Sequence, residues 1–345
     1  MRTDIENWPG WPGNRPAIIA EVGINHGGDE SLAWEMIQAA HENGADFVKL
    51  QTYSTERFFH PSLSYFDSTK KMELSSDSTA RLFKKANSIG AFLISTPFDI
   101  ENVDLLETFA PPLYKVASMD NDNYPLIQSI SKKGCPLIIS CGMASIEEIQ
   151  RVVDVVKDTG NDQLVLMHCV SDYPADPASL NLNMIPYLTD LTNVPVGFSD
   201  HAIGMHSSYL AASLGAVVVE KHFTTDRKLE SKIPDADHEI SFEPSELKNL
   251  RVFCEAIPTM KGVAPRKISK GEASGRKNFR RGIFAKRHIK VGEPLTLENT
   301  IFLRPVGGIP AGCWDQIEEK KAVRSINAMQ PIQFSDLGLL TKVDS

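Results

Sequence analysis

Long apolar runs are missing from this 345-residue sequence, and cysteine is scarce. No stretch approaches the roughly 20 apolar residues that a membrane-spanning helix needs. The polar first 16 residues also lack the apolar core of a secretion signal. The five cysteines are widely spaced and include no Cys-x-x-Cys pair, which argues against a disulfide framework or a structural zinc site. We therefore expect a cytoplasmic protein with no membrane partner.

Basic residues are also outnumbered by acidic ones. The sequence has 36 Lys and Arg and 44 Asp and Glu, which gives a net charge of -8. Affinity for a nucleic-acid backbone comes from clustered Lys and Arg, so this balance argues against a nucleic-acid partner. The one dense basic stretch, residues 276–281, is interpreted as a solvated connector, with a ligand site as the alternative.

Eight β-rich apolar runs alternate with amphipathic, helix-like stretches between Ala17 and Gly262. Near-continuous apolarity is typical of strands buried on both faces. Eight strand–helix units in about 245 residues match a (β/α)8 TIM barrel, whose functional site lies at the C-terminal ends of the strands. A doubly wound open sheet is the alternative, less favoured because no Gly-x-Gly-x-x-Gly opens the first helix. The runs occupy residues 17–23, 46–52, 91–96, 114–118, 136–140, 163–169, 194–200 and 216–223.

The pattern changes after Gly262. Residues 263–281 are polar and contain glycine, whereas residues 282–345 hold short strand-like pieces separated by Gly and Pro turns. We therefore expect a barrel domain over residues 1–262, a linker over residues 263–281, and a small, mostly β domain over residues 282–345.

Each apolar run ends in polar residues, which a barrel would gather at one rim. If these residues only capped helices, they would be Ser, Thr, Asp and Asn. Lysines, glutamates and paired histidines are therefore hard to explain as caps. The polar residues at the run ends are Glu21, Lys49, Gln51, Ser95, Thr96, Lys115, Ser118, Ser140, His168, Ser171, Ser199, His201, Glu220 and His222.

Two of these rim residues are lysines, Lys49 and Lys115. A buried lysine must meet an anion or lose its charge, so a phosphate-bearing substrate would suit both. Hydroxyl groups at the same rim would complete a cradle for phosphate and carboxylate. A lysine that forms a Schiff base, as in some aldolases, is the alternative chemistry. The hydroxyl residues are Thr96, Ser118, Ser140 and Ser199.

His201 and His222 end the seventh and eighth runs, which are neighbouring strands in a barrel about 4.8 Å apart. Both imidazoles could reach one ion, and two histidines with water and substrate oxygens suit an octahedral, catalytic divalent metal better than a closed zinc site. The alternative is that either is an ordinary hydrogen-bonded histidine. His168 and His26 are less specific, and His168 is read as a candidate core residue.

Several segments together resemble the N-acetylneuraminate (sialic acid) synthase family. They include AEVGINHGG from Ala20, ADFVKLQTY from Ala45, IISCGMASIEEI from Ile138, MHCVSDYPA from Met167 and VGFSDHAIG from Val196. The C-terminal FAKRHIKVGEPLTLENTIFLRPVGGIP is similar to the antifreeze-like (SAF) module that follows the barrel in these synthases. The resemblance spans nearly the whole chain after residue 16, and one departure is Ala117-Ser118-Met119-Asp120 where the family usually has Pro-Ser-Gly-Glu.

The resemblance implies a metal-dependent condensation of phosphoenolpyruvate with an N-acetylated amino-sugar aldehyde, which gives a sialic-acid-like nonulosonate and phosphate by C–O cleavage. The acceptor stays open between N-acetylmannosamine, the 2,4-diacetamido precursors of legionaminic and pseudaminic acids, and a surface or spore-coat polysaccharide precursor. A 2-keto-acid aldolase and a non-enzymatic glycan-binding protein are the rival functions.

The resemblance also assigns roles to single residues. His201 and His222 would bind Mn2+ or Mg2+, and Glu21 would be the catalytic carboxylate. Arg304 would reach the active site of the partner subunit, which implies a domain-swapped homodimer. Phosphoenolpyruvate would be held by Lys49, Thr96, Lys115, Ser118, Ser140 and Ser199, and the sugar by Gln51, Tyr173, Asp237 and Arg304.

Overall fold

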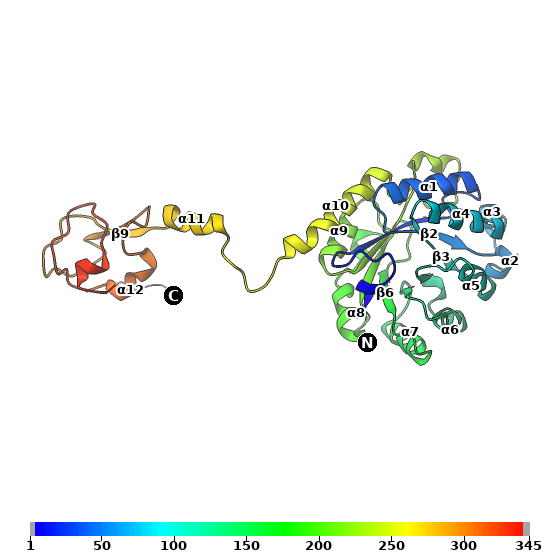
Figure 1. Cartoon of the computed structure of the whole chain (residues 1–345), viewed down its shortest axis with the longest axis horizontal. Helices are drawn as coiled ribbons and strands as arrows, with labels where there is room; N and C mark the ends of the chain where they lie inside the picture. The colour runs from blue at the N-terminus through cyan, green and yellow to red at the C-terminus, as the bar shows by residue number, and fades with distance from the viewer. Residues whose placement is uncertain (1–3, 341–345) are drawn as a thin grey trace. The chain divides into compact units, whose positions relative to one another are not determined.

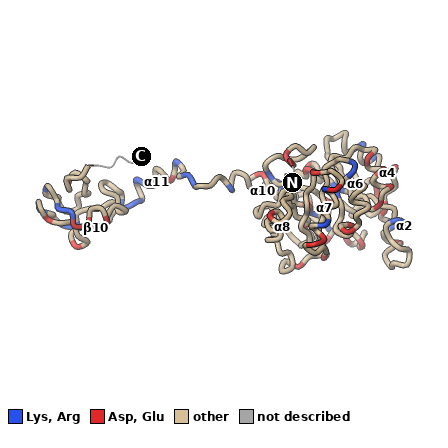
Figure 2. The backbone as a smooth tube through the Cα atoms, turned by 90° about the horizontal axis from the view of Figure 1, so that it is seen from below, with Lys and Arg blue, Asp and Glu red and all other residues tan. Residues whose placement is uncertain are grey.

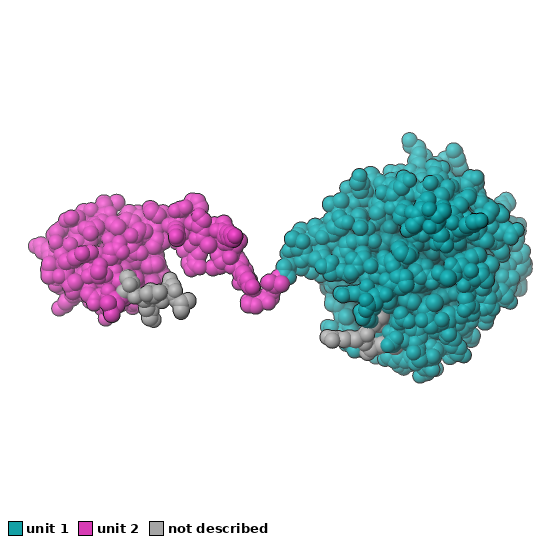
Figure 3. Space-filling view, viewed as in Figure 1, with its two compact units in different colours: residues 1–262 teal, residues 263–345 magenta. Residues whose placement is uncertain are grey.

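The computed structural model describes residues 4–340. The chain divides into two compact units, Met1–Gly262 and Val263–Ser345, which Figure 3 shows in separate colours. Each unit has its own apolar core. None of the helices in the described range is long and apolar enough to cross a membrane.

The first unit is a ring of eight parallel strands, in the order β3-β2-β1-β8-β7-β6-β5-β4. Strand β1 pairs with both β2 and β8, and β3 packs against β4 at the ends of this order, so the sheet curls into a barrel. This confirms the predicted TIM barrel and excludes the open sheet. The strands are β1(Ala17–Gly23), β2(Phe47–Thr52), β3(Phe92–Pro97), β4(Tyr114–Val116), β5(Leu137–Ser140), β6(Leu164–Cys169), β7(Val196–Asp200) and β8(Val218–His222).

Amphipathic helices surround the barrel (Figure 1). Helix α7 begins with the capping box expected from its sequence, in which Ser145 and Glu148 exchange side-chain and backbone hydrogen bonds. The surrounding helices are α1(Glu30–Glu42), α4(Ser76–Ser88), α5(Ile100–Glu107), α6(Tyr124–Ser131), α7(Ile146–Asp158), α8(Met184–Thr192), α9(His206–Ser213) and α10(Pro244–Lys261), while α2(Thr55–Phe58) and α3(Phe66–Met72) lie in the loop after β2.

The barrel interior changes character from one end to the other. Near the N-terminal ends of the strands it is filled by apolar side chains, and Trp8 and Trp11 of the N-terminal segment pack beneath them. The two indole rings meet edge to face at 5.2 Å. This end is therefore sealed by apolar contacts, and polar chemistry is confined to the opposite end.

The second unit is built around the antiparallel pair β9(Gly282–Ala285) and β10(Thr300–Leu303). Isolated bridges and short helical turns, with α12(Trp314–Ile317), complete a small module around Ile283, Ile289 and Ile326. The stretch expected to be a linker contains the helix α11(Lys270–Phe279), which begins with a capping box between Ser269 and Glu272. Figure 2 shows Lys and Arg recurring along this stretch.

Candidate active site

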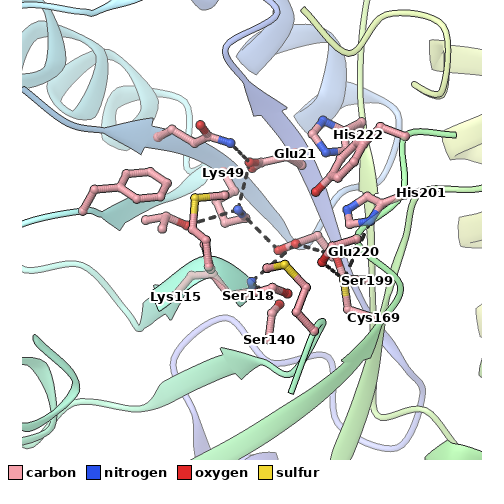
Figure 4. A pocket seen from close by; sticks show the side chains of 18 of the residues that line it. Glu21, Lys49, Lys115, Ser118, Ser140, Cys169, Ser199, His201, Glu220 and His222 are labelled. Atoms are coloured by element: carbon pink, nitrogen blue, oxygen red, sulfur yellow. Dashed lines mark hydrogen bonds and ion pairs between the residues drawn. The ribbon is translucent and has the colours of Figure 1, made fainter. Parts of the chain in front are cut away.

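A cavity of about 450 Å³ lies at the C-terminal ends of the barrel strands. Figure 4 shows side chains from several strands pointing into it. The cavity brings together most of the residues that the sequence nominated, namely Glu21, Lys49, Gln51, Thr96, Lys115, Ser118, Ser140, Tyr173, Ser199, His201 and His222.

The alternation of side chains along a β-strand explains why these residues meet. Residues two apart point to the same face of a strand. Ile19 belongs to the apolar interior and Glu21 lines the cavity above it. In the same way Phe47 is followed by Lys49, and Val218 by Glu220. β1, β2 and β8 thus each present an apolar residue to the sealed end and a polar residue to the cavity.

The floor of the cavity is a network of two lysines and two carboxylates (Figure 4). The Nζ atom of Lys49 lies 2.9 Å from Oε1 of Glu21 and 3.6 Å from Oε2 of Glu220. The Nζ atom of Lys115 lies 3.6 Å from Oε1 of Glu220 and donates a hydrogen bond to the Ser140 hydroxyl at 2.6 Å. Glu220 therefore pairs with both lysines, all within the buried end of the cavity.

Hydroxyl and amide groups satisfy most of the remaining polar atoms of the floor. Lys49 donates to the Thr96 hydroxyl at 3.2 Å, and the Gln51 amide donates to Oε1 of Glu21 at 3.1 Å. The Ser199 hydroxyl donates to Oε1 of Glu220 at 3.0 Å. These bonds fix the orientation of both carboxylates.

Burial and neighbouring charges move the pKa values of the two carboxyl groups in opposite directions. Burial raises the pKa of Glu21, and the nearby Lys49 offsets only part of this effect. Burial also acts to raise the pKa of Glu220, but Lys115 and Lys49 outweigh it and hold the pKa below its ordinary value. Glu220 is thus the permanent counterion of the floor, whereas Glu21 is the carboxyl group more readily protonated.

The two lysines also differ. Burial acts to lower the pKa of Lys49, but the carboxylates of Glu21 and Glu220 outweigh it and raise the pKa. Burial lowers the pKa of Lys115, and Glu220 compensates only in part. Lys115 is therefore the cation that gains most from an added anion.

The loop after β5 brings the backbone close to the serines on one side of the cavity. The backbone N–H of Gly142 donates to the Ser118 hydroxyl at 3.1 Å. A Cβ atom at residue 142 would collide with the hydroxyl oxygens of Ser118 and Ser171. Any larger residue at position 142 would have to displace the side chains of both serines.

His201 and His222 face each other across the cavity wall, with their ring centroids 5.5 Å apart. Nδ1 of His201 lies 2.8 Å from the Val170 carbonyl, which requires a proton on Nδ1 and leaves Nε2 as the free acceptor. The ring of Tyr173 stacks on the imidazole of His201, with 4.1 Å between the ring centroids. Nδ1 of His222 lies 3.5 Å from Oδ2 of Asp237 and has no hydrogen-bond partner in the described structure.

This donor set fits a divalent ion that takes two ligands from the protein. An imidazole with one nitrogen fixed by a carbonyl group and the other free is the usual arrangement of a metal ligand. The described residues contain no group of three or more His, Cys, Asp or Glu side chains placed to hold a metal. An ion bound by His201 and His222 would therefore complete its coordination with water and substrate oxygens.

Two predicted residues lie outside the set that lines the cavity. Asp237, in the loop after β8, borders the site through His222, and its backbone N–H donates to Oδ1 of Asn25. Arg304 is an exposed residue of the second unit, directly after β10. Of the less specific histidines, His168 has its Nε2 atom 2.6 Å from the Leu180 carbonyl and is absent from the lining.

Sequence reasoning gave no role to several residues that line the cavity. Glu220 was named only as a polar residue at the end of a strand. Because it lies two residues before His222, the strand period predicts that both side chains point into the barrel. Cys169 lies 3.7 Å from Nδ1 of His201, two residues after the inward-facing Met167. The aromatic and methionine residues of the cavity mouth come from loops and had no periodic signal.

Comparison with known proteins gives the family. The NeuB family model matches residues 36–265, and the SAF domain model matches residues 280–338. An uncharacterized protein of Methanocaldococcus jannaschii is 39% identical over 85% of this chain and 86% of its own length. The N,N'-diacetyllegionaminic acid synthase of Legionella pneumophila is 37% identical over 85% of this chain and 86% of its own length.

A solved structure agrees with the sequence relatives. The N-acetylneuraminic acid (sialic acid) synthetase of Leptospira borgpetersenii, crystallised with citrate, superposes with a TM-score of 0.71 at 34% identity, over 76% of this chain and 90% of that chain. The fold and the relatives agree, and the chain belongs to the NeuB family of sialic-acid-type synthases, with a SAF domain after its barrel.

Proposed function

We propose that this enzyme condenses phosphoenolpyruvate with the open-chain aldehyde of an N-acetylated amino sugar, to give a nine-carbon 2-keto acid and phosphate. The observation that carries the proposal is the pair of buried lysines, Lys49 and Lys115, at the closed end of the cavity. The names of the relatives supply the product class, because legionaminic and sialic acids are what the Legionella and Leptospira enzymes are named for.

The floor is built to receive a multiply charged anion. The two lysines face the two carboxyl groups of Glu21 and Glu220, and Lys115 has only a share of Glu220 beside its neutral partner Ser140. Because the pKa of Glu21 is raised, this carboxyl group can take up a proton when an anion binds, which leaves positive charge for the anion. The hydroxyls of Ser118 and Ser199 lie on the same cavity wall and can donate to phosphate or carboxylate oxygens. Phosphoenolpyruvate carries both groups within one small molecule.

His201 and His222 would hold a divalent cation, Mn2+ or Mg2+. The bond from Nδ1 of His201 to Val170 leaves Nε2 of His201 free, and Nδ1 of His222 faces Oδ2 of Asp237 at 3.5 Å, so each imidazole can offer its other nitrogen to the ion. When bound, such an ion polarises the aldehyde oxygen of the acceptor as a Lewis acid. The two imidazoles are held by Val170, Tyr173 and Asp237, which would fix where that aldehyde lies.

Glu21 is the residue that we assign to proton transfer. Its Oε1 atom is engaged by Lys49 and Gln51, while its Oε2 atom has no hydrogen-bond partner in the described structure. In the reaction, C3 of phosphoenolpyruvate forms a bond to the aldehyde carbon, water adds at C2, and the C–O bond to phosphate breaks. Oε2 of Glu21 would take one proton from the adding water and pass it to the former aldehyde oxygen, which becomes the new hydroxyl group, while the departing phosphate takes the proton of the C2 hydroxyl as the keto group forms. The raised pKa of Glu21 suits it to this transfer.

Phosphate release from phosphoenolpyruvate in the presence of an amino-sugar panel tests the proposal. We expect release only with an N-acetylated aldose, complete loss with EDTA, and recovery with Mn2+. His201→Ala and His222→Ala should each remove turnover while the barrel remains folded by circular dichroism. Activity with pyruvate in place of phosphoenolpyruvate would instead identify an aldolase, and sugar binding without turnover and unaffected by EDTA would identify a glycan-binding protein.

We further propose that Arg304 completes the acceptor site of a second copy in a domain-swapped homodimer. Charge supports this, because residues 1–262 hold 21 Lys and Arg against 36 Asp and Glu, whereas residues 263–345 hold 15 against 8. Of these, 7 Lys and Arg and 1 Glu lie in the connector, residues 263–281, whereas residues 282–345 hold 8 against 7. The connector is thus cationic and the barrel anionic, and long-range attraction favours an approach of the connector to a barrel.

Mixed dimers test the swap. Arg304→Ala alone should lower kcat/KM for the acceptor by about tenfold or more, the scale for losing one partner of a desolvated charge contact. A dimer of one Arg304→Ala chain and one Glu21→Gln chain would have one site with both lesions and one intact site, so partial activity should return. Mixed dimers that form and stay inactive would exclude the swap.

A further inference from the structure

A buried ion pair lies in the barrel wall beside the two histidines, outside the cavity. Asp200 on β7 and Lys221 on β8 are register partners in the sheet, and Nζ of Lys221 lies 3.5 Å from Oδ1 of Asp200. Both side chains are 0% exposed. Each residue stands between two cavity-lining residues in the sequence, so strand alternation turns its side chain toward the surrounding helices. The pair therefore bridges β7 and β8 directly before His201 and His222.

The position of this pair is not explained by stability. Burying two charges is costly, and their attraction often fails to outweigh that cost, so apolar residues of similar volume are commonly as stable. The preceding outward positions of the same strands carry Phe198 and Val219, which belong to the apolar core of the barrel unit. The change from apolar to charged residues thus falls at the last outward position before each histidine, where the end of the strand has to be held.

Hydrogen bonds from the pair hold the backbone after His201. Oδ1 of Asp200 accepts from the backbone N–H of Ala202 at 2.9 Å, and Nζ of Lys221 donates to the carbonyl of the same residue. Oδ2 of Asp200 accepts from two serine hydroxyls in the first turn of α9, at 2.7 and 2.5 Å. The pair thus binds both polar groups of one peptide unit and ties the turn that follows His201 to α9.

The same lysine lies beside the chain that holds His222. Its Nζ atom is 5.1 Å from the ring centroid of Phe242, and the backbone N–H of Phe242 donates to the His222 carbonyl at 2.7 Å. The His201 carbonyl in turn accepts from the backbone N–H of Ala175 at 3.0 Å. The backbones of both histidines are therefore held from outside the cavity, while their rings line it (Figure 4).

We infer that Asp200 and Lys221 are positioning residues that set the distance between His201 and His222, and through it the affinity of the site for a divalent cation. The inference rests on the proposed function, in which the two imidazoles hold that ion. Metal–ligand distances vary by only about 0.2 Å, so a small displacement of one strand end removes one of the two protein ligands. Neither positioning residue lines the cavity, so each acts only through the histidines.

Mn2+ binding tests the inference, measured in the presence of phosphoenolpyruvate by the loss of the electron paramagnetic resonance signal of the free ion. The double variant Asp200→Leu/Lys221→Met replaces the pair with apolar side chains and leaves no isolated charge, so it should fold. Its Kd for Mn2+ should rise about tenfold or more, the scale for losing groups that orient metal ligands. Turnover should fall more at limiting Mn2+ than at saturating Mn2+.

Lys221→Met alone is the second variant, because the Asp200 carboxylate keeps its three hydrogen bonds from Ala202 and the serines and stays satisfied. It should also weaken Mn2+ binding, through the loss of the bond to the Ala202 carbonyl. This variant decides the question even where the double variant does not fold.

The matched control is Arg15→Met/Asp46→Leu. Arg15 and Asp46 form another buried pair, with 2.6 Å between Nη2 and Oδ1, but Asp46 lies directly before β2 at the sealed end of the barrel. The control should lower the denaturant midpoint and leave the Kd for Mn2+ unchanged.

Variants of Asp200 and Lys221 that bind Mn2+ as wild type does, or a control that loses affinity equally, overturn the inference and leave the proposed function standing. Wild-type protein that binds no Mn2+ overturns the metal site of the proposed function as well.

Discussion

Replacing Glu220 by glutamine should destabilise the barrel by removing the carboxylate shared by the two buried lysines. The change preserves shape and removes only charge. Lys49 keeps Glu21 at 2.9 Å, but Lys115 keeps no carboxylate within ion-pair distance in the described structure, since its one such pair is with Glu220. The variant therefore leaves one uncompensated cation at the bottom of the cavity.

The expected magnitude follows from burial. Removing one partner of a buried ion pair costs about 3–5 kcal/mol, because the remaining charge is desolvated without compensation. Lys115 can relieve part of this cost by losing its proton, since burial already lowers its pKa. We therefore expect a loss of about 3 kcal/mol in the free energy of unfolding of the barrel, at the lower end of that range.

Guanidinium unfolding followed by tryptophan fluorescence measures this change. Three of the four tryptophans, Trp8, Trp11 and Trp34, lie in the barrel unit, so the signal reports mainly on it. Glu107→Gln is the matched control, because Glu107 pairs with Lys133 at the surface, and such a pair contributes about 0–1 kcal/mol.

Two results would contradict the reasoning. The first is a Glu220→Gln barrel no less stable than the Glu107→Gln control. The second comes from adding Lys115→Met to the Glu220→Gln chain, which removes the isolated cation and should recover part of the lost stability. A double variant that is less stable by the full sum of its single changes would show that the two residues are not coupled.

Two further predictions concern the loops around the site. Burial lowers the pKa of His26 from 6.5 to about 4, so its neutral form stabilises the fold fully above pH 6.5 and this contribution is lost as the pH falls toward 4. Between pH 7.5 and pH 5 the free energy of unfolding of wild type should therefore fall by about 2 kcal/mol more than that of His26→Gln. Denaturant unfolding at each pH measures this difference, and an equal fall in both proteins would contradict the prediction. Gly142→Ala should raise KM for phosphoenolpyruvate about tenfold or more, because the added Cβ displaces the hydroxyl groups of Ser118 and Ser171. A misplacement of about 1 Å in a binding group can by itself weaken catalysis by this much. Gly271→Ala, where the added Cβ meets no atom within 4 Å, is its control, and an equal KM in the two variants would contradict the prediction.

The barrel and most of its site could be predicted because a strand repeats every two residues. Apolar runs ending in Glu21, Lys49 and His222 place those side chains on the inward face at the C-terminal rim whatever the details of packing. The same rule applied backward from His222 would have given Glu220, already named as a rim residue, a place inside the cavity. The helix α11 was missed although Ser269 and Glu272 carry a capping-box pattern.

The sequence by itself determined the strand order, the polar rim and the pair of histidines, because local periodicity and the closure of eight units leave little freedom. Only the tertiary structure decided which charges share a partner, as Glu220 does with both lysines, since ion pairing depends on distances between strands. It also decided which apolar side chains meet at the cavity, where Tyr65, Met119 and Met143 come from three loops. Loop residues meet through backbone turns and ring contacts that no spacing along the chain records.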